Sequence, residues 1–187
     1  LAKEHVKKNN VYGCEVLIAK CNLSLKRYDD ALRQSSEIYL RSASDIMNVS
    51  FIQIMILLKR KKIQEAFDLV NWSISFINSI IQENDMFKNV LCPFIYLKAT
   101  CERLLNMDSL ESISILKDIS KNPFIENVTS DVNVLKHYFG KNDSVLLIDS
   151  NIQNTFKEII KQTSKKDIYY KTIINIYNEI FEGALYE

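Results

Sequence analysis

The stretch VLIAKCNLSLKRYDDALRQSSEIYL, residues 16–40, places a short basic turn between two apolar helical runs. A second stretch, SFIQIMILLKRKKIQEAFDLVNWSI, residues 50–74, has the same order of features: an apolar helix, a Lys/Arg turn, and a helix that opens with an acid, an alanine and a large apolar residue. Ala31 and Ala66 lie 35 positions apart in this alignment. A repeat of about 34 residues made of two helices is typical of helical-hairpin arrays. The two stretches therefore predict two successive hairpins.

The acids after the first turn are interpreted as part of a helix start and not as a catalytic pair. Asp29 and Asp30 fall in the first turn of the predicted second helix, where carboxylates interact favourably with the positive end of the helix dipole. Adjacent helical residues point about 100° apart, so the two carboxylates cannot act together on one substrate. Ala31 is small where the two helices approach each other, and Tyr28 is predicted to fill the space beside it.

A third, degenerate hairpin is predicted over residues 93–120. Pro93 suits the first turn of a helix, and a polar turn follows at residues 106–108. Either Ser112 or Ile113 stands where the alanine is expected. An apolar stripe near the C-terminus is suited to covering the end of a hairpin array. Helices are predicted there over residues 130–140, 151–162 and 166–185.

The composition agrees with a helical chain. Only 3 Gly and 2 Pro occur in 187 residues, whereas all-β and dinucleotide-binding folds need Gly in their turns and phosphate loops. The predicted fold is all-α: a right-handed α-solenoid of about three helical hairpins over residues 1–120. Residues 121–187 are expected to form a helical capping region in the same compact unit.

The two hairpins resemble the tetratricopeptide repeat family over about residues 11–84. That family has a small residue in the first helix, an aromatic residue after the turn, and alanine beside a large apolar residue in the second helix. The chain departs from this pattern at Glu15, Asn22 and Ile54, where the family favours Trp, Tyr and a small residue. The matching residues are Ala19, Tyr28, Ala31 and Leu32 in the first hairpin, and Ile63, Ala66 and Phe67 in the second.

The resemblance implies a concave groove lined by the first helix of each hairpin. Val16 and Ile52 stand at two positions where chaperone-binding members use Lys and Asn to clamp a carboxylate, so a chaperone co-factor is not expected. An apolar groove with scattered Lys would suit a partner helix or an extended apolar segment. Alternatively, some of these side chains pack on neighbouring repeats. The implied lining consists of Val16, Lys20, Leu23, Ser24, Phe51, Met55, Leu58 and Lys59.

A second candidate surface is a basic rim. Clusters of Lys and Arg occur at equivalent turns of successive hairpins, and stacking of the hairpins would place them side by side. Such a rim would suit an acidic protein segment, a phosphopeptide or an RNA backbone. The alternative is that these are solvated turns without a ligand. The rim consists of Lys26, Arg27, Lys59, Arg60, Lys61 and Lys62.

No motif for catalysis, metal or cofactor binding is found. His5 and His137 have no Cys, Asp or Glu at metal-ligand spacing, and neither a phosphate-binding glycine loop nor a nucleophile elbow occurs. The protein is therefore expected not to be an enzyme and to use no cofactor. The cysteines form no CxxC pair and are predicted to be reduced and buried; they are Cys14, Cys21, Cys92 and Cys101.

These patterns favour a non-enzymatic scaffold or adaptor that binds other proteins as a subunit of a larger intracellular complex. Alternatives are an RNA-associated helical-repeat subunit that uses the basic rim, and a packing subunit of a coat or proteasome-lid type assembly. The net charge of +1 provides no global attraction to nucleic acid or membranes. The apolar run at residues 51–58 is too short to span a bilayer. A cytoplasmic location is expected, with no membrane insertion and no small-molecule substrate.

Overall fold

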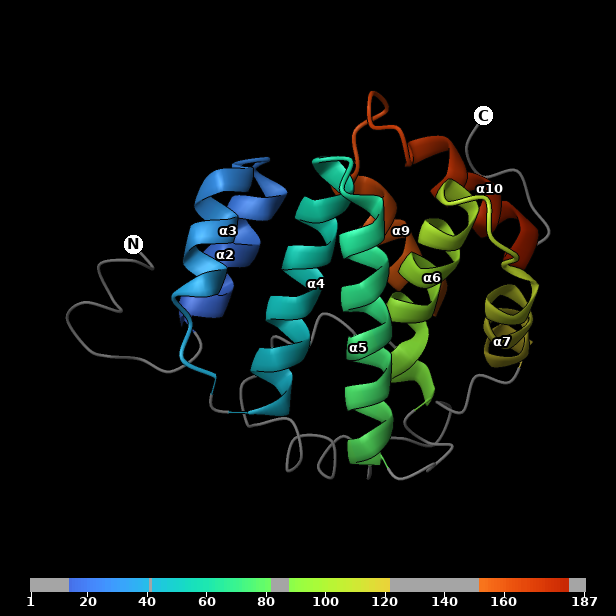
Figure 1. Ribbon diagram of the computed structural model, residues 1–187, viewed down its shortest axis with the longest axis horizontal. Helices are drawn as coiled ribbons and strands as arrows, with labels where there is room; N and C mark the ends of the chain where they lie inside the picture. Colours follow the sequence, from blue (N-terminus) through green and yellow to red (C-terminus); the bar gives the residue numbers. More distant parts are fainter. Residues whose placement is uncertain (1–13, 41, 82–87, 122–151, 182–187) are drawn as a thin grey trace. The chain divides into compact units, whose positions relative to one another are not determined.

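Every regular element that the structure describes is an α-helix. The computed structural model describes residues 14–40, 42–81, 88–121 and 152–181 (Figure 1). No strand occurs within these ranges, which confirms the predicted all-α class. The helix predicted over residues 130–140 lies outside the described residues.

The chain forms two compact units. Unit 1 contains the described residues up to Ile56, and unit 2 contains those from Leu57 onward. The boundary falls inside helix α4, so the last turn of that helix belongs to unit 2. Each unit is described below by itself.

Unit 1 contains a helical hairpin and most of a third helix. Helices α2 (Cys14–Ser24) and α3 (Tyr28–Ser36) pack on each other, and Ala31 of α3 is completely buried. Helix α4 (Ala43–Lys59) begins with a reciprocal capping box. The backbone N–H of Ser42 donates to Asp45 Oδ2 at 3.1 Å, and the backbone N–H of Asp45 donates to Ser42 Oγ at 3.2 Å. This box satisfies N–H groups that the first turn of a helix leaves without partners.

The same backbone turn ends three of the helices. The second residue after each helix adopts a left-handed conformation, with φ of 59° at Lys26, 60° at Lys61 and 56° at Asn106. In the first turn, Lys26 N–H donates to the Leu23 carbonyl and Arg27 N–H donates to the Asn22 carbonyl. The turns at Lys61 and Asn106 have the same two hydrogen bonds. This is the Schellman motif, which reverses the chain while its own backbone satisfies the last helical carbonyls.

The predicted repeat agrees with the observed helix boundaries. Helix α5 (Ile63–Ile81) begins 35 residues after α3, and the left-handed residues Lys26 and Lys61 have the same spacing. The third turn, between α6 (Lys88–Leu104) and α7 (Leu110–Lys121), is longer. Counted from the start of its helix, Ile113 stands at the position that Ala31 has in α3. The N–H of Ile113 donates to the Ser109 carbonyl, just as the N–H of Ala31 donates to the Arg27 carbonyl. Of the two residues considered from the sequence, Ile113 is therefore the equivalent one.

The expected position of Pro93 was wrong. The proline lies inside α6, which begins at Lys88, and not in its first turn. Proline lacks the N–H that would bond a carbonyl of the preceding turn, which normally disfavours this position. Burial of the residues around it outweighs that cost, because Leu91, Cys92 and Phe94 are all at least 93% buried.

Helix α6 is central to unit 2, where it contacts α5, α7, α9 (Ile152–Gln162) and α10 (Tyr170–Phe181). It is buried on nearly all sides over residues 91–102, as expected for a helix surrounded by others. Tyr96 joins three helices: its ring stacks on Phe156 of α9 with centroids 4.2 Å apart, and its hydroxyl donates to the Ile173 carbonyl of α10. Burial raises the pKa of Tyr96 well above its usual value, so this hydroxyl keeps its proton.

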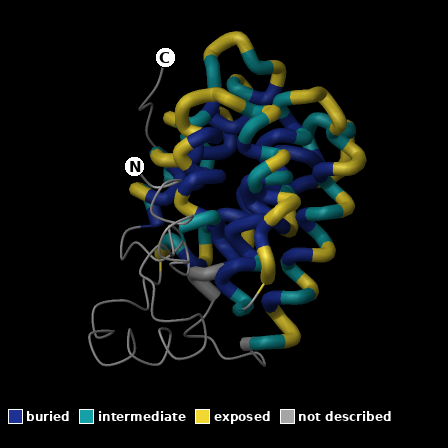
Figure 2. Tube along the Cα trace, turned by 90° about the vertical axis from the view of Figure 1, so that its left-hand side faces the viewer, coloured by how far each residue is buried: buried dark blue, intermediate teal, exposed yellow. Residues whose placement is uncertain are grey.

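Helices α10 and α5 each bury one face. The apolar stripe predicted near the C-terminus is confirmed in its middle, because Ile173, Ile174, Tyr177 and Ile180 of α10 are buried. Tyr170 and Phe181, at the two ends of the stripe, are half-buried. On α5, the large apolar residues Phe67 and Ile74 are only half-buried. Figure 2 shows buried and exposed residues alternating along the helices. The buried residues of α5 are Ala66, Val70, Ser73 and Ile77.

The left-handed turn residue supplies a stability test. Lys61→Gly is expected to raise the free energy of unfolding by about 0.5–1 kcal/mol, because glycine adopts a positive φ without the steric cost that a Cβ brings. Ser75→Gly, on the exposed side of α5, is expected to lower it by about the same amount, because glycine disfavours helix interiors. Urea denaturation of the two variants measures both changes. A loss of stability in Lys61→Gly would contradict the assigned turn.

Candidate functional site

The side chains predicted to line a groove are mostly buried in the chain. Val16, Lys20, Leu23, Phe51, Met55 and Leu58 are each no more than 7% exposed. Ser24 is exposed, and the side chain of Lys59 is 27% exposed. A groove needs accessible side chains, so this burial does not favour an open groove at these positions. The signal was present in the sequence, because an apolar run without a polar face, such as residues 51–58, is typical of a helix buried on all sides.

Lys20 is the one charged residue among those buried side chains. It is 7% exposed, and burial lowers the pKa of its ammonium group from 10.5 to about 8. The physical cause is the loss of hydration, which penalises the charged form. The charge on Lys20 is therefore unfavourable in the folded state at neutral pH, and Lys20 does not present a cation to solvent.

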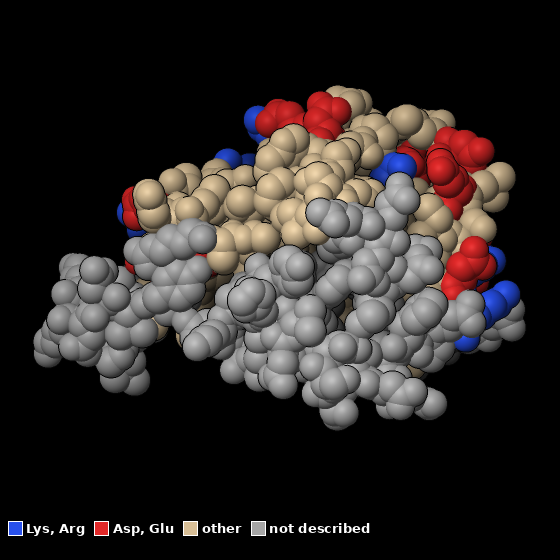
Figure 3. Space-filling view, turned by 90° about the horizontal axis from the view of Figure 1, so that it is seen from below, with Lys and Arg blue, Asp and Glu red and all other residues tan. Residues whose placement is uncertain are grey.

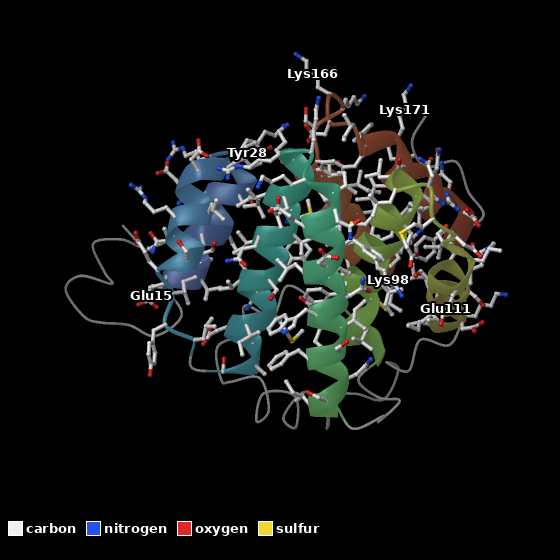
Figure 4. All side chains as sticks on the ribbon, viewed as in Figure 1. Glu15, Tyr28, Lys98, Glu111, Lys166 and Lys171 are labelled. Carbon is white, nitrogen blue, oxygen red and sulfur yellow. The ribbon has the colours of Figure 1, made fainter. Side chains whose placement is uncertain are left out.

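The turn between α9 and α10 carries two lysines at its tip. Residues 163–169 join α9 to α10, and within them Asp167 N–H donates to the Ser164 carbonyl at 2.8 Å. Ser164 N–H in turn donates to Asp167 Oδ2 at 2.9 Å. These two bonds close a four-residue turn whose middle positions are Lys165 and Lys166, both exposed. Figure 4 shows Lys166 extending away from the ribbon, as does Lys171 at the start of α10.

An ion pair joins this turn to the turn between α4 and α5. The ammonium group of Lys59 donates to Asp167 Oδ1, across 108 positions of sequence. The side chain of Asp167 is only 5% exposed, and its other oxygen is occupied by Ser164 N–H. Because the carboxylate is nearly enclosed and bonded on both oxygens, it holds the base of one turn against the end of α4.

The two joined turns form a local concentration of positive charge, here called the basic patch: Arg60, Lys61, Lys62, Lys165 and Lys166. All five are exposed. With Lys59, residues 59–65 and 163–169 carry six cations and two carboxylates, Glu65 and Asp167. Among the described residues, no carboxylate lies within ion-pair distance of Lys61, Lys165 or Lys166.

Two other cations of unit 2 are engaged by a carboxylate. Figure 3 shows Asp and Glu side chains gathered in several places on the face seen from below. Arg103 of α6 is engaged within the fold, since it bonds Glu179 of α10 and donates to Ser109 Oγ at 3.1 Å. Lys117 lies 3.9 Å from the same Glu179. These cations hold α10 against α6 and α7.

The structure brings together only some residues of the predicted basic rim. Lys26 and Arg27 lie in unit 1 and the other four rim residues in unit 2, so their alignment stays a prediction. Within unit 2, Lys59 pairs with Asp167, and Lys62 pairs with Glu65 at 2.8 Å. The sequence did not indicate Lys165 and Lys166, because only the fold brings them to the α4–α5 turn.

An aromatic pair on α5 is the second exposed feature. The indole of Trp72 is 51% exposed and stacks on Phe76, with ring centroids 5.4 Å apart and planes within 6° of parallel. Trp72 is therefore accessible to solvent on α5. Tryptophan is enriched among the residues that dominate protein–protein binding energies.

The chemistry of the cysteines is that of thiols within the fold. None of the four forms a disulfide; Cys92 and Cys101 are buried as predicted, whereas Cys14 is half-buried and Cys21 is exposed. Burial raises the pKa of both Cys92 and Cys101 to about 12, which keeps these thiols protonated and unreactive at neutral pH. No group of three His, Cys, Asp or Glu side chains suited to a metal ion is found in the described ranges.

The chain matches no protein-family model, no curated protein and no solved structure. The resemblance to tetratricopeptide repeats therefore stays a prediction. In the part of the chain that the structure describes, no helix is both long and apolar enough to cross a membrane.

Lys20 supplies a pH-dependent prediction. Between pH 8 and 10.5 the unfolded lysine holds its proton while the folded one has lost it, so the Lys20 contribution raises stability as pH increases through this window. Lys20→Met is therefore expected to be more stable than the wild type by about 2–3 kcal/mol at pH 7, with the difference shrinking toward pH 10.5. Urea denaturation of both proteins at each pH measures the difference, which cancels the titration of the buried thiols. A constant difference would contradict the lowered pKa.

The ion pair between the two turns supplies a double-mutant test. Lys59→Met is expected to lower the free energy of unfolding by about 2 kcal/mol, because Asp167 stays buried without its cation. Adding Asp167→Asn is expected to recover about half of that loss, because the amide removes the buried charge and still accepts from Ser164 N–H. Lys62→Met, which breaks an exposed pair, serves as the control and should change stability by less than about 0.5 kcal/mol. Equal effects of Lys59→Met and Lys62→Met would contradict the structural role of Asp167.

Proposed function

We propose that this chain is a non-enzymatic helical scaffold that binds other proteins as a subunit of a larger assembly. The observation that carries the proposal is the basic patch, because two turns far apart in sequence are joined by an ion pair whose carboxylate is nearly enclosed, and they present exposed cations at one place. An accessible charged surface on a rigid base steers a partner of opposite charge and limits the orientations in which it binds.

The architecture that we propose is a short right-handed solenoid of helical hairpins. Its support is the recurrence of one backbone turn at Lys26, Lys61 and Asn106, together with the 35-residue spacing of the first two. In unit 2, contacts of α10 with α6 and α7 fit a helix that covers the last hairpin of such an array. The exposed Trp72 would add an apolar contact on a separate helix face.

RNA binding is the second candidate function, and the same patch favours it. A phosphate backbone is attracted by clustered lysines whatever its sequence, and such binding falls steeply with salt. The described patch contains no exposed aromatic side chain on which a base could stack. The protein partner is therefore the function that the geometry supports better.

Recovery of partners from the native cells tests the proposal. The tagged chain is expected to recover at least one protein in stoichiometric amount, and ribonuclease treatment is expected to leave that recovery unchanged. Lys165→Glu with Lys166→Glu should reduce recovery about tenfold, because each reversal replaces an attraction by a repulsion. Lys121→Glu, which reverses an exposed cation at the end of α7 in the same unit, should reduce it much less.

Two results would contradict the proposal. Loss of all recovered protein after ribonuclease treatment would transfer the function to RNA. Recovery of no stoichiometric protein at either low or high salt would show that the chain does not act as a scaffold. Trp72→Ala provides a separate arm, because loss of a partner in that variant alone would place binding on α5 and not on the patch.

A further inference from the structure

One apolar side chain lies exposed in the turn that carries Lys165 and Lys166 of the basic patch. Ile168 follows Asp167 in the turn between α9 and α10 and is 47% exposed. Lys165 and Lys166 precede it, and Lys171 follows one helical turn later. Along the chain, the exposed Ile168 therefore lies between exposed lysines.

The backbone around Ile168 holds this arrangement in place. Asp167 is bonded to Lys59 and to Ser164, and Tyr170 N–H donates to the Asp167 carbonyl at 3.1 Å. The next residue, Tyr169, is 2% exposed and anchors the start of α10. The exposure of Ile168 is therefore set by buried and bonded residues on both sides, so little ordering is needed when a ligand binds.

The chemistry of the patch favours one class of ligand. Four of its five cations are lysines, whose ammonium groups attract carboxylates and phosphates alike as point charges, so the charge alone does not choose between them. An aliphatic side chain among the lysines can bury an apolar side chain, whereas a nucleic-acid base is better held by an aromatic ring. Acidic and apolar groups in one short chain occur in acidic protein segments.

We infer that the basic patch binds an acidic protein segment that also carries an apolar side chain, which packs on Ile168 while its carboxylates pair with Lys61, Lys165 and Lys166. This inference rests on the proposed function, since it names the chemistry of the protein partner. The apolar contact distinguishes such a segment from a purely anionic ligand, because the contact adds affinity that salt does not screen.

Defined peptides test the inference by fluorescence polarisation. The probe is a labelled peptide of about twelve residues with glutamates and regularly spaced leucines, compared with one in which serine replaces leucine and with an oligouridine of about twelve nucleotides. At about 50 mM salt the leucine peptide is expected to bind about fivefold tighter than the serine peptide. Lys165→Glu with Lys166→Glu is expected to weaken both peptides about tenfold.

Ile168→Ser separates the apolar contact from the charges. This variant is expected to remove the preference for leucine and to leave the affinity for the serine peptide unchanged. Lys121→Glu, at the exposed end of α7, is the charge-reversal control and should leave both affinities within about twofold of the wild type. Circular dichroism and thermal unfolding of every variant check that the helices are retained.

Three outcomes would overturn the inference. A preference for leucine that survives Ile168→Ser would place the apolar contact elsewhere. Tighter binding of oligouridine than of either peptide would assign the patch to RNA. Absence of peptide binding at low salt, with cellular partners still recovered in the pull-down, would reject the acidic segment while leaving the scaffold proposal standing.

Discussion

The left-handed residue that ends α2, α4 and α6 is the constraint on which the hairpins depend. A helix that ends on such a residue satisfies its last carbonyls through its own backbone, so no side chain is needed to close the turn. The side chains of Lys26 and Lys61 are left in solvent, and the chain reverses within about three residues. The turn that makes the fold compact is therefore also the turn that exposes cations.

Packing around α6 brings the helices of unit 2 together. Tyr96 contributes a stacked ring to α9 and a hydrogen bond to α10, so one side chain holds two later helices against the same central helix. With α10 held there, the turn that precedes it reaches the end of α4, where Asp167 pairs with Lys59. The basic patch thus depends on core packing as well as on its own residues.

Features that depend on interactions between residues close in the sequence could be predicted, whereas those that depend on residues far apart in the sequence could not. The hairpin spacing and the turns depend on neighbours within a few residues, and therefore Ala31, Ala66 and the turn at Asn106 were recognised from local pattern. The Lys59–Asp167 pair joins residues 108 positions apart and has no local signature. The start of α6 was misplaced because the cost of Pro93 inside a helix is outweighed by burial, which depends on residues far away in the sequence.

The candidate groove and the basic patch show why a surface is harder to predict than a helix. The groove was inferred from a family in which first-helix side chains face a ligand, yet Phe51, Met55 and Leu58 are buried here. The net charge of +1 gave no indication of the patch, because a near-neutral chain can still have its cations clustered at one place. The buried carboxylate beside Lys165 and Lys166, that of Asp167, is already paired with Lys59. It therefore does not neutralise the exposed charges of Lys165 and Lys166. The acidic partner that we propose is attracted by the local field at the two turns, and not by the total charge of the chain.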